Sequence, residues 1–310
     1  MKKVKKKCKA LSNFKRSLPF LTLAFPGALV LFLFRLVPLF GLIIPFKDYI
    51  PAKGFWKSEW VGFDNFKFLF KQEAVKQATR NTLIYNFTGI ILGIVAGVLI
   101  ALLLYELSNK FVKIYQTILY LPHFVSFVVM AFVLKGILDM EHGMLNNVIE
   151  YFGGQPKNWY ALPKYWYWII PILSVWKGIG NNALMYYAAL IGISPELYES
   201  ARIDGAGKLQ QVWHISIPMI KNIIIVLFIL HIGKVMYADM TLFWNVPLQS
   251  PALRDATEVL DTYVFKVMKD PSVPMGMSAA AAFYQSVIGL VLVLVSNTIA
   301  KKVDPESGMF

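Results

Sequence analysis

Cysteine is almost absent from this sequence, since Cys8 is the only one among 310 residues. A single cysteine excludes a disulfide within the chain and any site built from paired thiols. The patterns HExxH, CxxC and GxSxG are also absent, as is the phosphate loop GxxxxGK followed by Ser or Thr. We therefore expect no catalytic site, no metal site and no bound cofactor, ATP included.

Charged residues are scarce as well, at 16% of the sequence, whereas about one quarter is usual for a soluble domain. Hydrophobic residues make up 57%, and the mean hydropathy is +0.54. Apolar stretches of roughly 20 residues, the length of helix that crosses the hydrocarbon core of a bilayer, recur along the chain. The composition predicts an all-α protein that crosses a membrane several times.

Six apolar stretches are predicted as transmembrane helices. The first follows a Lys-rich segment, but it is too long for a signal peptide and has no small-x-small cleavage site, so we interpret it as a retained helix. We expect a single membrane domain at 18–300 between short tails at 1–17 and 301–310. The predicted spans are 18–45, 82–106, 115–138, 166–192, 218–240 and 276–300.

The basic residues predict the orientation in the membrane. The net charge is +13, and Lys and Arg are concentrated in the first 16 positions. Such a cluster beside an apolar helix indicates a cytoplasmic segment that faces anionic membrane lipid, rather than nucleic-acid binding. With six spans, both termini and the loops at 107–114 and 193–217 are predicted to be cytoplasmic. The longer loops at 46–81, 139–165 and 241–275 then face outward.

Aromatic residues are concentrated in two of the outward loops. Such side chains often form a belt at the membrane interface. They could alternatively form a docking surface for an extracellular partner, and both interpretations remain open. The residues are Trp56, Trp60, Phe63 and Phe66 in the first loop, and Trp159, Tyr160, Tyr165, Trp166 and Trp168 in the second.

The cytoplasmic loop at 193–217 begins with a clear helix signal. Ser194 is expected to cap a helix that has Pro195 in its first position. Glu196 then lies near the positive end of the helix dipole. A short ordered helix at the cytoplasmic surface is thus predicted here.

Two glycines follow this short helix. Gly205 and Gly207 are expected to turn the chain out of it, because glycine adopts positive φ without steric cost. A second short helix is predicted at about 208–216, and Pro218 is expected to begin the next span. Two short helices around a glycine turn would suit docking by another protein, and a plain amphipathic surface helix is the alternative.

This loop resembles the Glu-Ala-Ala loop of the permeases of binding-protein-dependent ABC importers. The sequence departs from the usual motif at Ser200, where the family has Ala, and at Ile217, where it has Leu. The residues that match its spacing are Glu199, Ala201, Gly205, Ile215, Ile217 and Pro218. The resemblance implies that an ATPase subunit docks on Glu199, Ser200, Ala201, Asp204, Gly205, Ala206, Ile215 and Pro218.

The resemblance covers nearly the whole chain and is to the LplB-like group of complex-carbohydrate permeases, relatives of the maltose permease subunits. It implies a type I ABC importer bundle that works with a second homologous permease and two cytosolic ATPase subunits holding ATP and magnesium. It also implies an extracytoplasmic sugar-binding lipoprotein and a carbohydrate substrate. The similar segments outside the loop are 80–82, 120–126 and 176–178, and inside it 197–199 and 203–206.

The fourth and fifth predicted spans contain many polar and aromatic side chains. Polar groups inside a bilayer are costly and often mark a functional site. A sugar requires hydrogen-bonding groups and aromatic faces, so these residues are predicted to line the substrate pathway, with polar packing between helices as the alternative. They are Trp176, Lys177, Asn181, Asn182, Tyr186, Tyr187, His231 and Tyr237.

Other function classes are less consistent with the sequence. An ion-coupled secondary transporter would need a relay of carboxylates, which the spans do not show. A membrane enzyme would need histidines and carboxylates together, but the four histidines lie on different segments. Importers of peptides or amino acids share the docking loop, so only the flanking segments favour a carbohydrate over another solute.

Overall fold

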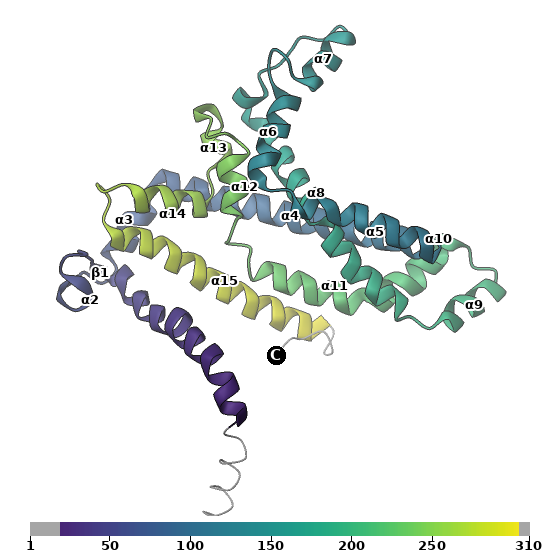
Figure 1. The fold of residues 1–310 in the computed structure, drawn as a ribbon, viewed down its shortest axis with the longest axis horizontal. Helices are drawn as coiled ribbons and strands as arrows, with labels where there is room; N and C mark the ends of the chain where they lie inside the picture. Colours follow the sequence, from purple (N-terminus) through teal and green to yellow (C-terminus); the bar gives the residue numbers. More distant parts are fainter. Residues whose placement is uncertain (1–18, 304–310) are drawn as a thin grey trace, which may run out of the picture. The chain divides into compact units, whose positions relative to one another are not determined.

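The computed structural model describes residues 19–303, so the predicted N-terminal tail at 1–17 and most of the C-terminal one lie outside the described residues (Figure 1). The described chain is largely helical. It divides into two compact units. One consists of the residues up to Phe66 together with Pro274–Ala280, and the other of Lys67–Val273 together with Ala281 and the residues after it.

The first unit contains the helical stretch Pro19–Phe46. Its second half departs from regular α winding, with the π-turn η1 (Phe32–Leu36) followed by the 3-10 helix η2 (Val37–Phe46). Pro38 and Pro45 lie in η2 and lack the N–H that an α-helix needs, which is consistent with this change of winding.

A small hairpin follows this helix in the loop at 46–81, which was predicted to face outward. The strand β1 (Lys47–Asp48) pairs antiparallel with β2 (Glu59–Trp60), and the short helix α2 (Gly54–Lys57) connects them. The buried Lys47 ammonium donates a 2.7 Å hydrogen bond to the Phe55 carbonyl oxygen. The aromatic side chains of this loop pack on one another, because the Phe46 ring lies 5.9, 5.4 and 5.3 Å from the rings of Trp60, Phe63 and Phe66.

Two long helices, α4 (Glu73–Tyr105) and α8 (Pro163–Ile191), pack along each other in the second unit. Glycines at every fourth position in the middle of α4 let the two backbones approach closely. A Cβ on Gly97 would lie only 3.1 Å from atoms of both Asn182 and Tyr186. The contact between the two helices therefore depends on positions without a side chain.

Shorter elements surround this helix pair. In Figure 1, α9 lies at one end of the second unit and α14 at the other. Two helices, α3 and α15, have residues in both units. The elements are α3 (Asp64–Lys71), α5 (Asn109–Phe124), α6 (Phe127–Leu138), α7 (Met144–Tyr151), η3 (Trp159–Ala161), α9 (Pro195–Ile203), α10 (Lys208–Gln211), η4 (Val212–Ser216), α11 (Ile217–Ile232), α12 (Met240–Asn245), η5 (Pro251–Leu253), α13 (Arg254–Thr257), α14 (Leu260–Lys269) and α15 (Met275–Val303).

Two hydrophobic clusters of the second unit involve α4 and α8. The cluster near α12 includes Trp159 and Trp166, which are 8% and 0% exposed. These two tryptophans of the second aromatic loop are therefore core residues and not part of an interfacial belt. The cluster near α9 includes Tyr186, Leu190 and Tyr198.

Each predicted span corresponds to a helical segment. Not all six segments, however, are single helices that are both long and apolar enough to cross a membrane. Within residues 19–303, four helices are long and apolar enough to cross a membrane, and the bent pair α5 and α6 makes five if it counts as one span. The sixth segment is α8, whose length is sufficient but which is not in that set. The four are Pro19–Phe46, Glu73–Tyr105, Lys208–Ile232 and Met275–Lys302.

The third predicted span, 115–138, is not one straight helix. It is α5 and α6, which meet at a bend of 95°. Val125 has extended backbone, and Ser126 starts α6 by accepting a 3.2 Å hydrogen bond from the Val129 N–H. The prediction was wrong because continuous hydrophobicity hides a break that a serine N-cap can make.

The fifth predicted span, 218–240, was also placed wrongly. The helical stretch runs from Lys208 to Ile232, so the expected helix at 208–216 is continuous with α11 and not separate from it, while Pro218 lies in the first turn of α11 as predicted. The α-helix ends at Gly233, and side-chain amides from other helices donate to carbonyl oxygens of the segment that follows. Their acceptors are the carbonyl oxygens of residues 235, 236 and 237.

Candidate functional site

The predicted docking loop forms a short helix followed by a tight turn. Pro195 occupies the first turn of α9 and Glu196 lies beside it, as predicted. Ser194 is the residue before the helix, but its side chain makes no capping hydrogen bond, so that part of the prediction was wrong. The backbone of α9 is therefore started by the proline and the favourable charge of Glu196.

The end of α9 is a Schellman turn. Gly205 has φ of +79°, and its N–H donates to the Arg202 carbonyl over 3.1 Å. The Ala206 N–H donates to the Ala201 carbonyl over 2.8 Å. Gly207 does not share this conformation, because its φ is −69° and it caps α10 instead. Only one of the two predicted glycines thus requires positive φ.

Side chains anchor this loop to two long helices. The buried Tyr198 hydroxyl lies 3.0 Å from the Ser216 hydroxyl, at the start of the helix that becomes α11. The Tyr198 ring also packs against Tyr105, the last residue of α4, with a centroid distance of 5.6 Å. In addition, Lys208 forms an ion pair with Glu106. A force on α9 would consequently act on both α4 and α11.

The predicted docking residues lie on and around a hollow of about 340 Å³. Ala201, Asp204, Gly205, Ala206 and Ile215 line it. Glu199, Ser200 and Pro218 are exposed beside it. The sequence interpretation missed three large apolar side chains that are exposed here, although an apolar residue in a loop predicted to be cytoplasmic is itself a signal. They are Ile203, Leu209 and Trp213, which are 87%, 76% and 66% exposed.

A second cavity, of about 250 Å³, lies between α4, α8 and α11. Three predicted pathway residues, Asn182, Tyr186 and His231, line it. The α4 residues Tyr85 and Asn86 also line it, and the sequence interpretation missed both. The sequence contained a signal for a functional role of α4, because polar side chains begin this predicted span and glycines follow them.

The other predicted pathway residues do not line this cavity. The Lys177 ammonium donates to the carbonyl oxygens of His123, over 2.9 Å, and of Val125, at the bend between α5 and α6. It also lies 4.9 Å from the centroid of the Phe127 ring. The Tyr237 hydroxyl lies 2.8 Å from that of Ser286. Trp176 and Asn181 are exposed, and Tyr187 is half-buried.

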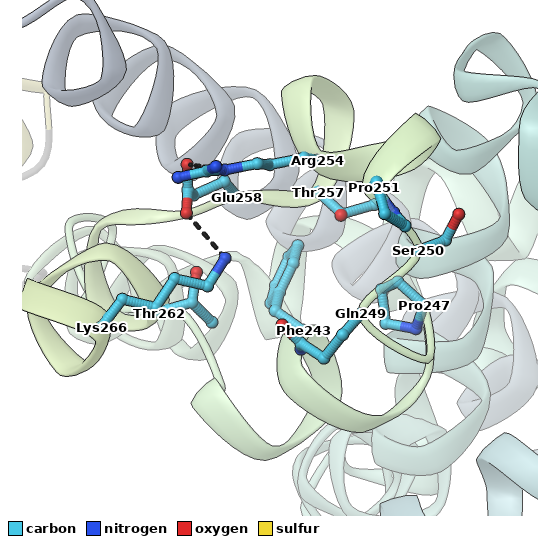
Figure 2. A pocket seen from close by; sticks show the side chains of 10 residues that line it. All are labelled: Phe243, Pro247, Gln249, Ser250, Pro251, Arg254, Thr257, Glu258, Thr262 and Lys266. Atoms are coloured by element: carbon cyan, nitrogen blue, oxygen red, sulfur yellow. Dashed lines mark hydrogen bonds and ion pairs between the residues drawn. The ribbon is translucent and has the colours of Figure 1, made fainter. Parts of the chain in front are cut away.

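A third pocket, of about 260 Å³, is formed by the outward-predicted loop at 241–275, and no residue of it was singled out from the sequence. Figure 2 shows the side chains of Arg254 and Lys266 reaching the carboxylate of Glu258 from different elements. Arg254 Nε lies 3.3 Å and Lys266 Nζ 2.8 Å from the Glu258 oxygens. Glu258 is only 7% exposed, so its charge requires these partners.

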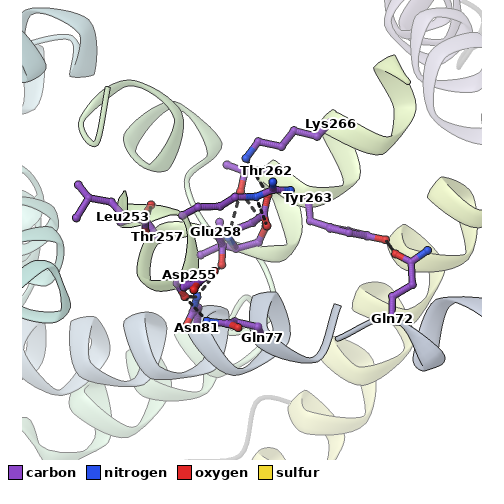
Figure 3. A network of polar contacts seen from close by, with 12 residues as sticks. Gln72, Gln77, Asn81, Leu253, Asp255, Thr257, Glu258, Thr262, Tyr263 and Lys266 are labelled. Atoms are coloured by element: carbon purple, nitrogen blue, oxygen red, sulfur yellow. Dashed lines mark hydrogen bonds and ion pairs between the residues drawn. The ribbon is translucent and has the colours of Figure 1, made fainter. Parts of the chain in front are cut away.

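Polar side chains of α4 hold the backbone of this pocket (Figure 3). Asn81 donates to the carbonyl oxygens of Asp255 and Glu258, over 2.8 and 2.9 Å. The Tyr85 hydroxyl donates to the Ala256 carbonyl over 2.8 Å. Since Tyr85 also lines the cavity between α4, α8 and α11, one helix contacts the pocket and the cavity together.

Comparison with known proteins gives consistent results along the chain. Residues 89–305 match the family described as binding-protein-dependent transport system inner membrane component. The polygalacturonan/rhamnogalacturonan transport system permease protein YteP of Bacillus subtilis (strain 168) is 36% identical, over 91% of this chain and 87% of the relative. Protein LplB of the same organism is 35% identical, over 97% of this chain and 93% of the relative.

Solved structures show the same similarity in three dimensions. One is a bacterial alginate ABC transporter in complex with an alginate pentasaccharide-bound periplasmic protein. It matches with a TM-score of 0.84 and 29% identity, over 94% of this chain and 97% of the other. A second, a bacterial ABC transporter involved in the import of the acidic polysaccharide alginate, matches with a TM-score of 0.86 and 28% identity, over 96% and 99%.

Proposed function

This chain belongs to the family of binding-protein-dependent transport system inner membrane components, and from that premise we propose how it works as the permease subunit of an ABC importer for a sugar or oligosaccharide. It is a multi-pass membrane protein with the type I permease fold. ATP hydrolysis on separate cytosolic subunits drives the transport, since the sequence has no phosphate loop of its own.

The anchored loop around α9 carries the coupling part of the proposal. Its Schellman turn gives it a fixed shape, and the exposed Glu199 and the hollow beside it offer a docking surface for an ATPase subunit. Movement of α9 passes to α11 through Tyr198 and Ser216, and to α4 through the ring contact of Tyr198 with Tyr105. Because α4 and α11 both line the cavity with Asn182, such movement would change its shape.

The full importer contains further subunits. We infer a second homologous permease, two ATPase subunits and an extracytoplasmic sugar-binding lipoprotein, in line with the periplasmic protein found in one of the similar structures. Docking of the ATPases on α9 requires that loop to be cytoplasmic. The loop at 241–275 then faces outward, and both termini are cytoplasmic.

A carbohydrate is the solute that the relatives support. The printed names of similar permeases include transport of polygalacturonan and rhamnogalacturonan, and of arabinooligosaccharides. The cavity itself contains the group types that bind sugars, with the aromatic ring of Tyr85, the amides of Asn86 and Asn182, and the imidazole of His231. An ion-driven mechanism has no comparable support.

Uptake into proteoliposomes tests this function. The permease is reconstituted with its second permease and ATPase subunits, and labelled oligosaccharide bound to the binding protein is added outside. We expect uptake that requires ATP, and no uptake by this chain alone. Uptake by the single chain in response to a proton or sodium gradient would contradict the proposal.

A further inference from the structure

The outward pocket of the second unit contains more positive charge than its own fold requires. Glu258 is its buried carboxylate, and Lys266 already pairs with one of its oxygens at 2.8 Å. Arg254 adds a second cation, which contacts the other oxygen through Nε alone, at 3.3 Å. We propose that this pocket binds the carboxylate of an acidic sugar unit, a uronate, before it enters the membrane cavity.

The guanidinium of Arg254 is suited to receive that carboxylate. Within residues 19–303 its terminal nitrogens have no hydrogen-bond partner, and its side chain is 61% exposed at the pocket. A guanidinium presents a planar pair of donors that match the two oxygens of a carboxylate. Glu258 fixes the Nε side of the group and thereby leaves the outer edge available for a ligand.

The remaining wall of the pocket has the chemistry that a sugar ring requires. The Ser250 hydroxyl donates to the Tyr160 carbonyl over 2.9 Å, and the Thr257 hydroxyl to the Leu253 carbonyl over 3.0 Å. Since each hydroxyl hydrogen is used, each oxygen remains an acceptor for a sugar hydroxyl. Phe243 provides an apolar surface in the same pocket (Figure 2).

The size of the pocket indicates one sugar unit rather than a whole oligosaccharide. Its volume of about 260 Å³ lies just below the roughly 300–1,000 Å³ range of pockets that bury a drug-sized ligand. A single unit of a longer chain would therefore occupy it, with the neighbouring units outside.

Backbone strain is concentrated at the edge of this pocket. Leu248 and Gln249 have φ of 53° and 51°, a conformation that is unfavourable for residues with a side chain. Gln249, which lines the pocket, is held there by a 2.6 Å hydrogen bond from its side chain to the Trp244 carbonyl. Residues in such conformations persist where the surrounding structure imposes them, and they concentrate at binding sites.

The inference rests on the proposed transport function, because it assigns a charge class to the solute of that importer. The printed descriptions of similar proteins include polygalacturonan and an acidic polysaccharide, alginate. The carboxylate could also come from an acidic side chain of the binding protein. The hydroxyl acceptors and the Phe243 surface beside Arg254 suit a sugar unit better than a lone carboxylate side chain, and binding by the protein is one outcome of the test.

The test compares a charged with an uncharged oligosaccharide on the purified, fully assembled transporter without its binding protein. The probes are trigalacturonate and its fully methyl-esterified form, and affinity is measured by calorimetry at two salt concentrations. We expect the charged probe to bind at least about tenfold more tightly, a difference of about 1.4 kcal/mol. The preference should decrease at higher salt.

Variants locate the binding to this pocket. Arg254→Gln should remove the preference for the charged probe, and Arg254→Lys should retain only part of it, because lysine lacks the paired donors. Lys269→Gln is the matched control, since Lys269 is a cation at the end of the neighbouring helix α14, lies over Phe265 and does not line the pocket. Size-exclusion elution and ATPase rate identify any variant that fails to assemble.

Three outcomes would overturn the inference. They are equal affinity for both probes, an unchanged preference in assembled Arg254→Gln, and an Arg254→Gln effect that appears only in the affinity for the binding protein. ATP-dependent uptake of a neutral oligosaccharide in the same preparation separates this failure from failure of the proposed function. In that case the proposed importer function would be supported, and the solute would be an uncharged sugar.

Discussion

The Tyr85 hydroxyl donates a 2.8 Å hydrogen bond to the carbonyl oxygen of Ala256, which joins α4 to the backbone beneath the outward pocket. Tyr85 is 4% exposed, and its ring stacks on Tyr167 at 5.6 Å and meets Phe243 edge-on at 4.9 Å. One side chain thus connects the pocket, the aromatic core and the cavity between α4, α8 and α11.

Tyr85→Phe should test this connection. The change keeps the ring but leaves the buried Ala256 carbonyl without its donor, which should cost about 1–3 kcal/mol of stability. We expect a lower midpoint of thermal unfolding and slower uptake, with normal membrane insertion. Tyr151→Phe is the control, because Tyr151 is 86% exposed and should change neither measurement. Equal behaviour of the two variants would contradict the structural role of the Tyr85 hydroxyl.

Gly205→Val should uncouple transport from ATP hydrolysis. Gly205 has φ of +79°, and no atom lies within 4 Å of an added Cβ, so the cost is backbone strain rather than a clash. For a non-glycine residue this strain costs about 1–2 kcal/mol. Copurification of the ATPase and uptake should both decrease, while the amount of protein in the membrane stays the same.

Gly207→Ala provides the matched control for that substitution. Its φ is −69°, and an added Cβ would be 3.8 Å from its nearest neighbour, the Gln210 side chain. Alanine should therefore be tolerated. If Gly205→Val preserves both ATPase binding and uptake, the docking assignment of this loop is wrong.

Glu199→Lys should weaken ATPase docking without altering the fold of this chain. The side chain is exposed on α9, and reversal of its charge changes the surface offered to a partner. Arg202→Glu tests whether the loss is specific to position 199, because Arg202 is also exposed on α9. The measurement is the affinity of the purified ATPase subunit for the reconstituted permease. General electrostatics would change the affinity in opposite directions in the two variants, and an affinity that Glu199→Lys leaves unchanged would contradict the docking contact.

Lys177→Met should disturb the bend between α5 and α6. It removes the ammonium that donates to the carbonyl oxygens of His123 and Val125. Unsatisfied carbonyls inside a membrane protein are costly, so we expect a lower unfolding midpoint and weaker uptake, with the ATPase still bound. Lys135→Met is the control, since Lys135 is exposed on α6. A raised KM for sugar without loss of stability would instead favour the pathway role predicted from the sequence.

Introduced thiols should map the membrane cavity. In a Cys8→Ser background, Asn182→Cys and His231→Cys should react with water-soluble thiol reagents, and sugar with ATP should change their rates. Trp176→Cys is exposed but outside the cavity, so its rate should not respond to sugar. Inert thiols at 182 and 231 would place these positions in packed protein and exclude the cavity as a pathway.

The backbone structure of the predicted docking loop could be predicted from sequence because its signals are local. Pro195, Glu196 and Gly205 act on the backbone within a few residues of themselves, and the structure confirms each of them. The prediction of a capping hydrogen bond from Ser194 was wrong, because a residue can occupy the N-cap position without making that bond. The family resemblance added the spacing of the loop and the carbohydrate class.

The role of α4 could not be predicted, since it depends on contacts between distant segments. Asn81 and Tyr85 bind the backbone of residues 255–258, more than 170 positions away. No period or spacing in the sequence encodes such a pairing. The same reason explains the outward pocket, whose charged residues look like ordinary surface side chains until Glu258 is seen to be buried.

The segment that follows α11 is held by other helices, after the helix itself has ended at Gly233. Residues 235 to 237 are Val, Met and Tyr, which an α-helix accepts, yet Asn86 and Gln285 occupy their carbonyl oxygens. Two side-chain amides therefore fix a stretch whose residue types are compatible with an α-helix. Loss of both amide donors would leave these carbonyl oxygens open to the main chain, and each helical turn gained there would lengthen α11 by about 5 Å.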